Sequence, residues 1–201
     1  MKTNPCYRGL VVSLLLSGLA AILGCDQPGG KDKSADEKTP RVDVRQGATV
    51  QLLDYDGIQK LIESKRGQVV VMDAWSTSCP PCLKEFPHLV ELHKQHGASG
   101  LACISLSFDF EGIGTPEEQL PNVEKFLNDQ GATFDNVLGS EESDALYRKF
   151  QLASVPAVFV YDRQGNLRKR FDNQQAKSER DAFTYEQVGE LVKELLNEPA
   201  K

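Results

Sequence analysis

Two cysteines separated by two prolines lie where an apolar stretch meets a helical pattern, and this junction restricts the possible folds more than any other part of the chain. Residues 69–72 are apolar and mostly β-branched, which predicts a buried strand. After Cys79-Pro80-Pro81-Cys82, apolar residues recur at helical spacing at Leu83, Phe86 and Val90. Proline is tolerated in a first helical turn because its missing N–H would have no partner there. The sequence therefore predicts a strand, a short loop and a helix whose first turn carries both cysteines.

The expected position of Cys79, just before this helix, favours redox chemistry. Only a thiolate attacks a disulfide, and a free cysteine thiol is mostly protonated at neutral pH. A helix N-terminus has unpaired N–H groups and a partial positive charge, which stabilise an anion. We therefore expect Cys79 to be exposed, partly ionised and nucleophilic. Cys82, one turn later, can close a small disulfide ring or resolve a mixed disulfide.

Two other interpretations of the cysteine pair remain open. Such a pair can form half of a zinc site, but that site needs about four ligands, and the domain offers besides only Cys103 and three histidines in unsuitable places. A structural disulfide is also conceivable, although so short a loop gains little from cross-linking. Cys103 falls in the apolar stretch 101–108 and is expected to be inert core. We therefore favour redox chemistry, with no metal and no cofactor.

The residues around the motif resemble the active site of the thioredoxin superfamily, whose pattern is W-x-x-x-C-x-x-C. Trp75 occupies the tryptophan position, and the nearest likeness is to membrane-anchored TlpA/ResA-like thiol-disulfide oxidoreductases. That family also has an acid six residues before the first cysteine, which here is Asp73. It has a helix-kinking proline five residues after the second cysteine, here Pro87, and a later cis-proline facing the disulfide, here Pro156. The likeness covers residues 46–197.

Asp73 follows four apolar residues on the predicted buried strand. A buried carboxyl is costly to ionise, so we expect its pKa to be raised. The resemblance implies that Asp73 takes the proton of Cys82 when that thiol attacks the mixed disulfide. The alternative is a paired polar residue at a strand end.

The resemblance also implies residues that contact the substrate: Trp75, Pro80, Pro81, Val155 and Pro156. In the family the peptide bond before the late proline is cis, and the backbone beside it pairs with the substrate as an added strand. For Trp75 two roles remain open, a cover over the disulfide that forms part of a docking surface, or core filling.

The N-terminal residues have the features of an export signal. Residues 1–24 begin with Lys2 and Arg8 and continue into an apolar core that is short for a transmembrane helix, which predicts a signal peptide. The end of this segment resembles a bacterial lipobox, which implies lipidation at Cys25; an uncleaved anchor helix is the alternative. Residues 25–45 are charged and poor in apolar side chains, so a flexible tether is expected. Lipidation at Cys25 and an uncleaved anchor helix would both place the domain outside the cytoplasm and on a membrane.

The remaining residues, 46–198, are predicted to form one domain. Strands are expected at 49–53, 69–72, 101–108, 155–162 and 167–171, and helices at 54–66, after the cysteines, at 122–130, at 140–150 and after the capping box Thr184-x-x-Gln187. Strands that alternate with helices, followed by a hairpin and a helix, predict an α/β sandwich. The resemblance specifies a thioredoxin-like three-layer sandwich with a central mixed β-sheet and an insertion between the second and third core strands.

Charge and resemblance together narrow the function. The formal net charge is −6 and basic residues are not clustered, so no nucleic-acid partner is expected. The resemblance implies an enzyme, a thiol-disulfide oxidoreductase that acts on protein thiols and disulfides. It favours reduction, for example of apocytochrome c or a copper-site thiol pair, with electrons from a membrane thiol carrier.

Two alternative functions are kept. A peroxide reductase could use Cys79; Ser76 suits that family's pattern, but Met72 stands where the family has proline. A copper-binding or metallochaperone module on the same fold would use a C-x-x-x-C pair and a distant histidine, a longer spacing than the one here.

Overall fold

The computed structural model describes residues 47–178 and 181–199. The predicted signal peptide (1–24), the lipidation site Cys25 and the tether (25–45) lie outside the described residues, so these stay predictions. Within the described ranges, no helix combines the length and the apolar character that crossing a bilayer requires.

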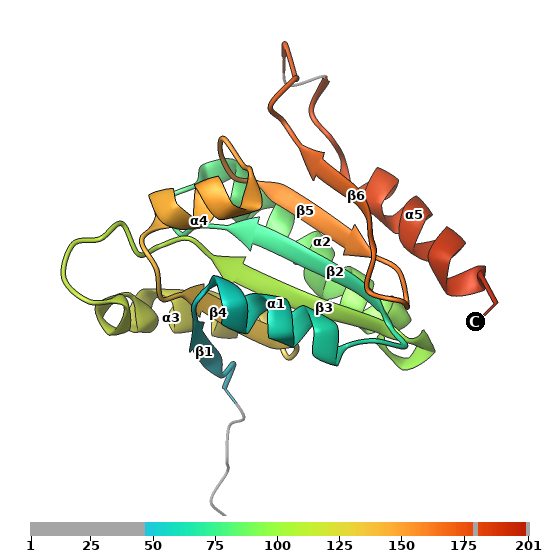
Figure 1. Ribbon diagram of the computed structural model, residues 1–201, viewed down its shortest axis with the longest axis horizontal. Coiled ribbons are helices and arrows are strands. Elements are labelled where there is room, and N and C mark those ends of the chain that lie inside the picture. Colours follow the sequence, from blue (N-terminus) through green and yellow to red (C-terminus); the bar gives the residue numbers. More distant parts are fainter. Residues whose placement is uncertain (1–46, 179–180, 200–201) are drawn as a thin grey trace, which may run out of the picture. The chain divides into compact units, whose positions relative to one another are not determined.

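A six-stranded mixed sheet forms the centre of the domain, with the strand order β1-β4-β3-β2-β5-β6 (Figure 1). The first four strands in this order run parallel, whereas β5 is antiparallel to β2 and β6 is antiparallel to β5. The strands are β1 (Val50–Leu53), β2 (Val69–Trp75), β3 (Leu101–Ser107), β4 (Asp135–Gly139), β5 (Ala157–Tyr161) and β6 (Leu167–Asp172).

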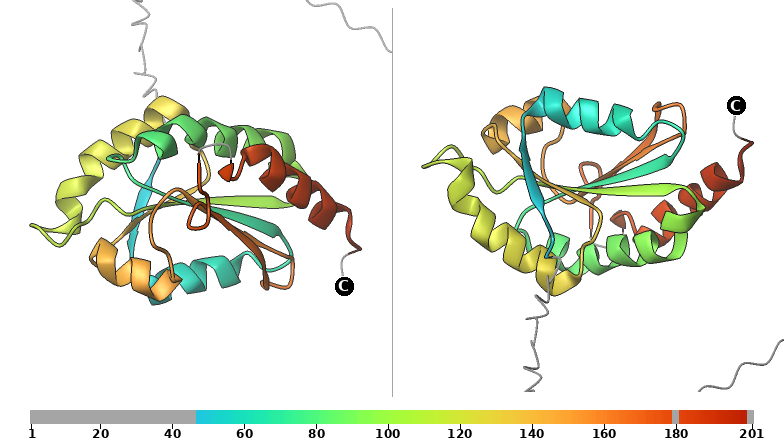
Figure 2. Two further views of the ribbon diagram at one scale, coloured as in Figure 1. Left: turned by 90° about the horizontal axis from the view of Figure 1, so that it is seen from above. Right: turned by 90° about the horizontal axis from the view of Figure 1, so that it is seen from below.

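Helices cover both faces of this sheet, which gives the three layers predicted from the sequence. Figure 2 shows α2, α3 and α5 on one face and α1 and α4 on the other. The helices are α1 (Tyr55–Ser64), α2 (Pro80–His96), α3 (Leu120–Gln130), α4 (Ser143–Phe150) and α5 (Tyr185–Asn197), and short 3-10 turns cover Gly97–Ser99 and Pro116–Gln119.

The central strand β2 is buried on both faces, as its run of apolar residues predicts. Side chains alternate along a strand. Val69, Val71 and Trp75 therefore join the core beneath α2, α3 and α5, and the intervening residues join the core beneath α1 and α4. Asp73 is in phase with the first set, so its carboxyl lies on the face that α2 covers. Cys82 belongs to the same core.

The insertion predicted between the core strands is present, and it contains a strand that was not predicted from the sequence. Between β3 and α4 the chain forms α3 and then β4, which pairs with both β1 and β3. The strand is only five residues long, and its Asn136 is a buried polar residue. The amide of Asn136 accepts a hydrogen bond from Ser105 and donates to the carbonyl of Phe134, which satisfies it inside the sheet.

Helix starts agree with the sequence in one case and differ in another. Thr184 and Gln187 form the predicted capping box at the start of α5. The helix expected at 140–150 begins later in the structure, as α4. Glu142 occupies the N-cap position without a side-chain bond, and Ser143 is the first helical residue.

Candidate active site

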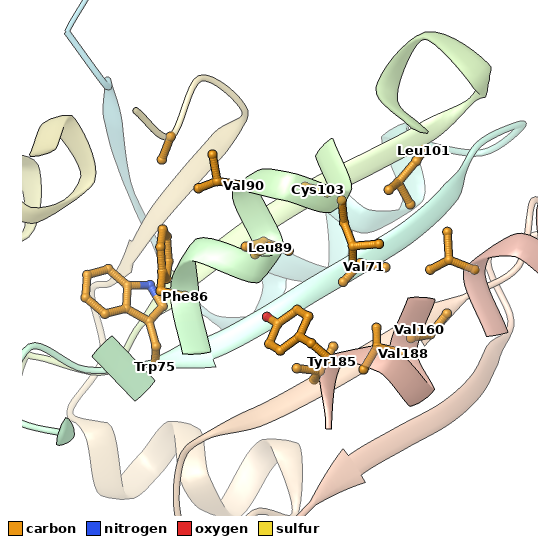
Figure 3. Close-up of a cluster of buried hydrophobic side chains, with 14 of the residues drawn as sticks. Val71, Trp75, Phe86, Leu89, Val90, Leu101, Cys103, Val160, Tyr185 and Val188 are labelled. Carbon is orange, nitrogen blue, oxygen red and sulfur yellow. The ribbon is translucent and has the colours of Figure 1, made fainter. Parts of the chain in front are cut away.

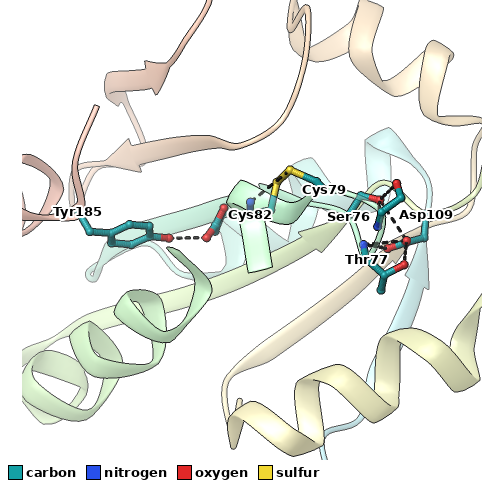
Figure 4. The surroundings of a disulfide bond; sticks show 8 residues. Ser76, Thr77, Cys79, Cys82, Asp109 and Tyr185 are labelled. Carbon is teal, nitrogen blue, oxygen red and sulfur yellow. Dashed lines mark hydrogen bonds between the residues drawn. A yellow bond between two sulfur atoms is a disulfide. The ribbon is translucent and has the colours of Figure 1, made fainter. Parts of the chain in front are cut away.

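Cys79 and Cys82 form a disulfide at the start of α2, with their Cα atoms 5.2 Å apart (Figure 4). Cys79 is the N-cap residue, and Pro80 and Pro81 fill the first helical positions, as predicted. The backbone N–H of Cys82 points at Cys79 Sγ, with the nitrogen 3.3 Å from the sulfur. An N–H in this position stabilises negative charge on the sulfur once the pair is reduced.

The two sulfur-bearing residues differ in exposure. Cys79 is half-buried, whereas only 2% of Cys82 is exposed. A partner protein can therefore reach Cys79 but not Cys82. This difference fits the predicted division of roles, in which Cys79 makes the first attack and Cys82 resolves the product.

The segment before β5 lies beside the disulfide, although it is far away in the sequence. The Val155–Pro156 peptide bond is cis, as the resemblance implied. Val155 and Cys79 line the same hollow, together with Ser78 and Tyr147. Pro156 lines a second groove, which also contains Pro80 and Pro81 from the start of α2, Lys84 and Phe183. Four of the five residues expected to contact the substrate therefore border two adjoining hollows at the disulfide.

Trp75 is the fifth of these residues, and its expected place on a docking surface was wrong. The side chain is completely buried (0% exposed). Its ring packs against Phe86 and Phe126, with ring centroids 5.0 and 4.7 Å away (Figure 3). Core filling, the alternative kept from the sequence, is the role that the structure supports. A tryptophan at a strand end meets apolar side chains from both α2 and α3 here, because the insertion adds a helix over this corner.

Asp73 is almost entirely buried (3% exposed), as its position on β2 predicted. The Tyr185 hydroxyl donates a hydrogen bond to Asp73 Oδ2, across the core from the start of α5 (Figure 4). Burial raises the pKa of Asp73 from 3.8 to about 7; the Tyr185 hydrogen bond lowers it and the negative charge of Glu85 raises it further. A carboxyl with this pKa can both accept and release a proton near neutral pH. Nothing in the sequence pattern indicates this role of Tyr185.

Asp109 is a second residue of the site that was not predicted from the sequence. It follows β3 and accepts hydrogen bonds from the backbone N–H of Thr77 (2.9 Å), the hydroxyl of Ser76 (3.1 Å), and the hydroxyls of Thr77 and Ser107. These bonds hold the loop that ends at Cys79 against the end of β3. An aspartate directly after a strand that runs parallel to β2 is the signal that could have indicated it, because the ends of parallel neighbours meet at one edge of a sheet.

Cys103 is inert core, as predicted. It is 1% exposed, and burial, with a smaller contribution from the charge of Asp73, raises the pKa of its thiol to about 12. His93 and His96 are half-buried, and the His93 ring packs on Phe134. Within the described ranges, no three His, Cys, Asp or Glu side chains are grouped as a metal site would require.

Comparisons with known proteins agree with this geometry. Residues 37–170, well over half of the chain, match the model of the AhpC/TSA family. A thiol-disulfide oxidoreductase ResA from Geobacillus thermodenitrificans is 28% identical over 118 residues, which is 59% of this chain and 62% of that relative. The match thus spans less than two thirds of the relative's length. The sporulation thiol-disulfide oxidoreductase A of Bacillus subtilis is 26% identical over 162 residues, 81% of this chain and 87% of that protein.

A solved structure has the same fold. The crystal structure of a thiol:disulfide interchange protein of the thioredoxin family from Chlorobium tepidum superposes with a TM-score of 0.51 at 23% identity, covering 67% of this chain and 84% of that one. The thioredoxin-like fold and the family resemblance inferred from the sequence are therefore confirmed.

Proposed function

Because the chain belongs to the AhpC/TSA family, we propose that it is a thiol-disulfide oxidoreductase that exchanges electrons with other proteins through Cys79 and Cys82. The observation that supports this proposal best is the disulfide at the N-terminus of α2, with one reachable and one buried cysteine beside a cis-proline segment. The names of the relatives point to the same chemistry.

The reaction proceeds in two exchange steps. In the reduced protein, the Cys79 thiolate attacks a disulfide of the partner, and one partner sulfur leaves as a thiolate. The Cys82 thiol then loses its proton to Asp73, and its sulfur attacks Cys79 Sγ. The bond between Cys79 and the partner breaks, and the second partner sulfur leaves as a thiolate that takes a proton from water. Two electrons have passed to the partner, and the Cys79–Cys82 disulfide has formed.

The substrate is a protein that presents a cysteine in an extended segment. Val155 shares a hollow with Cys79, and Pro156 lines a groove together with Pro80 and Pro81, which follow Cys79. An extended chain placed beside residues 155–156 would bring its cysteine to Cys79, which is the β-strand addition that the resemblance implies. Cytochrome c apoprotein is one candidate substrate.

Reduction of partners is the proposed direction, and the reduction potential of the Cys79–Cys82 pair tests both direction and function. We expect a single two-electron transition near that of thioredoxin, about −270 mV, when the full chain is equilibrated with thiol buffers and its free thiols are labelled. A potential near about −120 mV would reverse the proposed direction. A disulfide that stays closed below about −300 mV would be structural and would contradict the function.

A location outside the cytoplasm, with a lipid at Cys25 and electrons from a membrane thiol carrier, completes the proposal. It is supported by the charged start, apolar core and lipobox-like end of residues 1–25. Expressed with a radioactive fatty acid, the natural chain should be labelled and recovered in the membrane fraction. The variant Cys25→Ser should lose the label, while Cys6→Ser, which changes the other N-terminal cysteine, should keep it. Equal labelling of both variants would contradict lipidation at Cys25.

Of the two alternative functions, neither has a specific observation in its favour. The Ser76 hydroxyl, which a peroxide reductase would direct at its cysteine, is bonded to Asp109 and Ser78.

A further inference from the structure

The Asp73 carboxyl has one side-chain hydrogen bond within the described ranges, and the donor is the hydroxyl of Tyr185. The two residues lie 112 positions apart in the sequence and are both buried, at 3% and 6% exposure. A hydrogen bond between a neutral hydroxyl and a carboxylate is stronger than one between two neutral groups, above all where water is excluded. Tyr185 therefore stabilises the ionised form of the group that accepts the Cys82 proton in the resolving step.

Two features fix Tyr185 in this position. Thr184 and Gln187 close a capping box around the first turn of α5, and Tyr185 is the first residue of that helix. Its ring belongs to the same buried cluster as Val188, Val160 and Leu89, which Figure 3 labels. The hydroxyl is thus held at Asp73 by the fold of α5.

Several titratable groups face the pair. From α2 come Glu85 and His88, whose ring centroid lies 5.6 Å from that of Tyr185, and Cys82, which belongs to the same core as Tyr185. From β3 comes the protonated thiol of Cys103. On β5 the residue opposite Asp73 is Val158, which does not titrate. The charged residues of the groove between α2 and α5, which Tyr185 also borders, are Glu85, Glu91, Glu186, Glu190 and Lys193.

We propose that Tyr185 is a positioning residue for the resolving step: its hydroxyl holds Asp73 Oδ2 and thereby sets the pH range in which Asp73 can take the proton of Cys82. The inference rests on the proposed function. Without the hydroxyl, the ionised form of Asp73 would lose its hydrogen bond while the burial and the charge of Glu85 that oppose ionisation would remain. Asp73 would then stay protonated to higher pH, and it could accept the proton of Cys82 only in that higher pH range.

The variant Tyr185→Phe tests this proposal, because it removes only the hydroxyl. The assay uses the full chain with Cys6 and Cys25 changed to serine, reduced and mixed with an aromatic disulfide that releases a coloured thiolate. The first release reports the attack by Cys79, and the second reports resolution by Cys82. We expect the first phase to be unchanged. The pH midpoint of the second phase should rise by at least about one unit, which makes resolution about tenfold slower at pH 6.

Matched variants assign the effect. Tyr161→Phe removes a hydroxyl from the core beneath α1 and α4, on the opposite face of the sheet, and should leave both phases unchanged. In Asp73→Asn, the rate of the second phase should show no inflection with pH. This result would identify the inflection in the parent protein as the titration of Asp73. An unchanged second-phase midpoint in Tyr185→Phe would overturn the proposal while leaving the proposed function intact. Absence of a two-step release in the parent protein would instead contradict the proposed function.

A measurement on the parent protein covers the case in which Tyr185→Phe does not fold. The carbon-13 shift of Tyr185 Cζ should follow the titration of Asp73 Cγ with the same midpoint, because the hydrogen bond changes when the carboxylate gains a proton. Two different midpoints, or a Tyr185 signal that does not change with pH, would show that the hydroxyl is not bonded to the ionised Asp73 carboxylate. Either result would overturn the proposal.

Discussion

Changing Cys79 to serine should lower the rate of disulfide reduction, measured as kcat/KM, by at least about a thousandfold. A serine hydroxyl has nearly the size of the thiol, but its oxygen cannot exchange with a disulfide sulfur. The loss therefore comes from chemistry and not from packing, since Cys79 is only half-buried. Reduction of insulin by a dithiol, followed by the turbidity of the released chain, measures the effect.

Two other cysteine variants separate the roles of the sulfurs. Cys82→Ala should still attack the partner but should stop at the mixed disulfide, which non-reducing electrophoresis detects as an adduct that thiols dissolve. Cys103→Ser changes a thiol that is 1% exposed and forms no disulfide, so its turnover should stay near the natural value. Substantial activity in Cys79→Ser, or an adduct that forms equally well without Cys79, would contradict the assigned nucleophile.

The parts of this site that could be predicted from the sequence are those fixed by local pattern. The run of apolar residues in β2, the cysteines at the first turn of α2 and the burial of Asp73 all follow from periodicity and from the residue order around one junction. Val155 and Pro156, distant in sequence, could be placed only through the resemblance. The structure brings them to the disulfide because β5 pairs directly with β2.

The parts that the sequence did not indicate depend on contacts between distant segments. β4 is short and polar at Asn136, and it is stable as a strand because β1 and β3 pair with it on its two sides. In the sequence, Tyr185 resembles the apolar residues of the amphipathic helix that it begins. Only the packing of α5 against the sheet shows that its hydroxyl points at Asp73. The sequence left Trp75 open between a docking surface and the core, and its burial depends partly on Phe126 of α3, which belongs to the insertion.

Replacing Asp73 by asparagine should stabilise the oxidised protein at neutral and alkaline pH, and the gain should grow with pH. The pKa of Asp73 is raised from 3.8 to about 7, mainly by burial, so the folded state holds a proton that the unfolded chain has released. A carboxyl of this kind contributes its full stability below about pH 4 and loses it as pH rises through about 7. A shift of one pKa unit corresponds to about 1.4 kcal/mol. Above about pH 7, Asp73 therefore lowers the free energy of unfolding by about 4 kcal/mol relative to its value below about pH 4.

Asparagine has the shape of the protonated carboxyl and can still accept the hydrogen bond from Tyr185, but it never ionises. The free energies of unfolding of the two proteins, measured in urea at several pH values, should therefore be similar near pH 4 and should diverge in favour of the variant up to about pH 8. Asp162→Asn provides a control of opposite sign. Burial opposes the ionisation of Asp162, but hydrogen bonds from Asn166 and Gln164 outweigh it and lower its pKa. Its replacement should therefore destabilise the protein at neutral pH. A difference between Asp73→Asn and the natural protein that does not change with pH would mean that Asp73 is ionised in the core at little cost, and so would be poorly suited to receive a proton from Cys82.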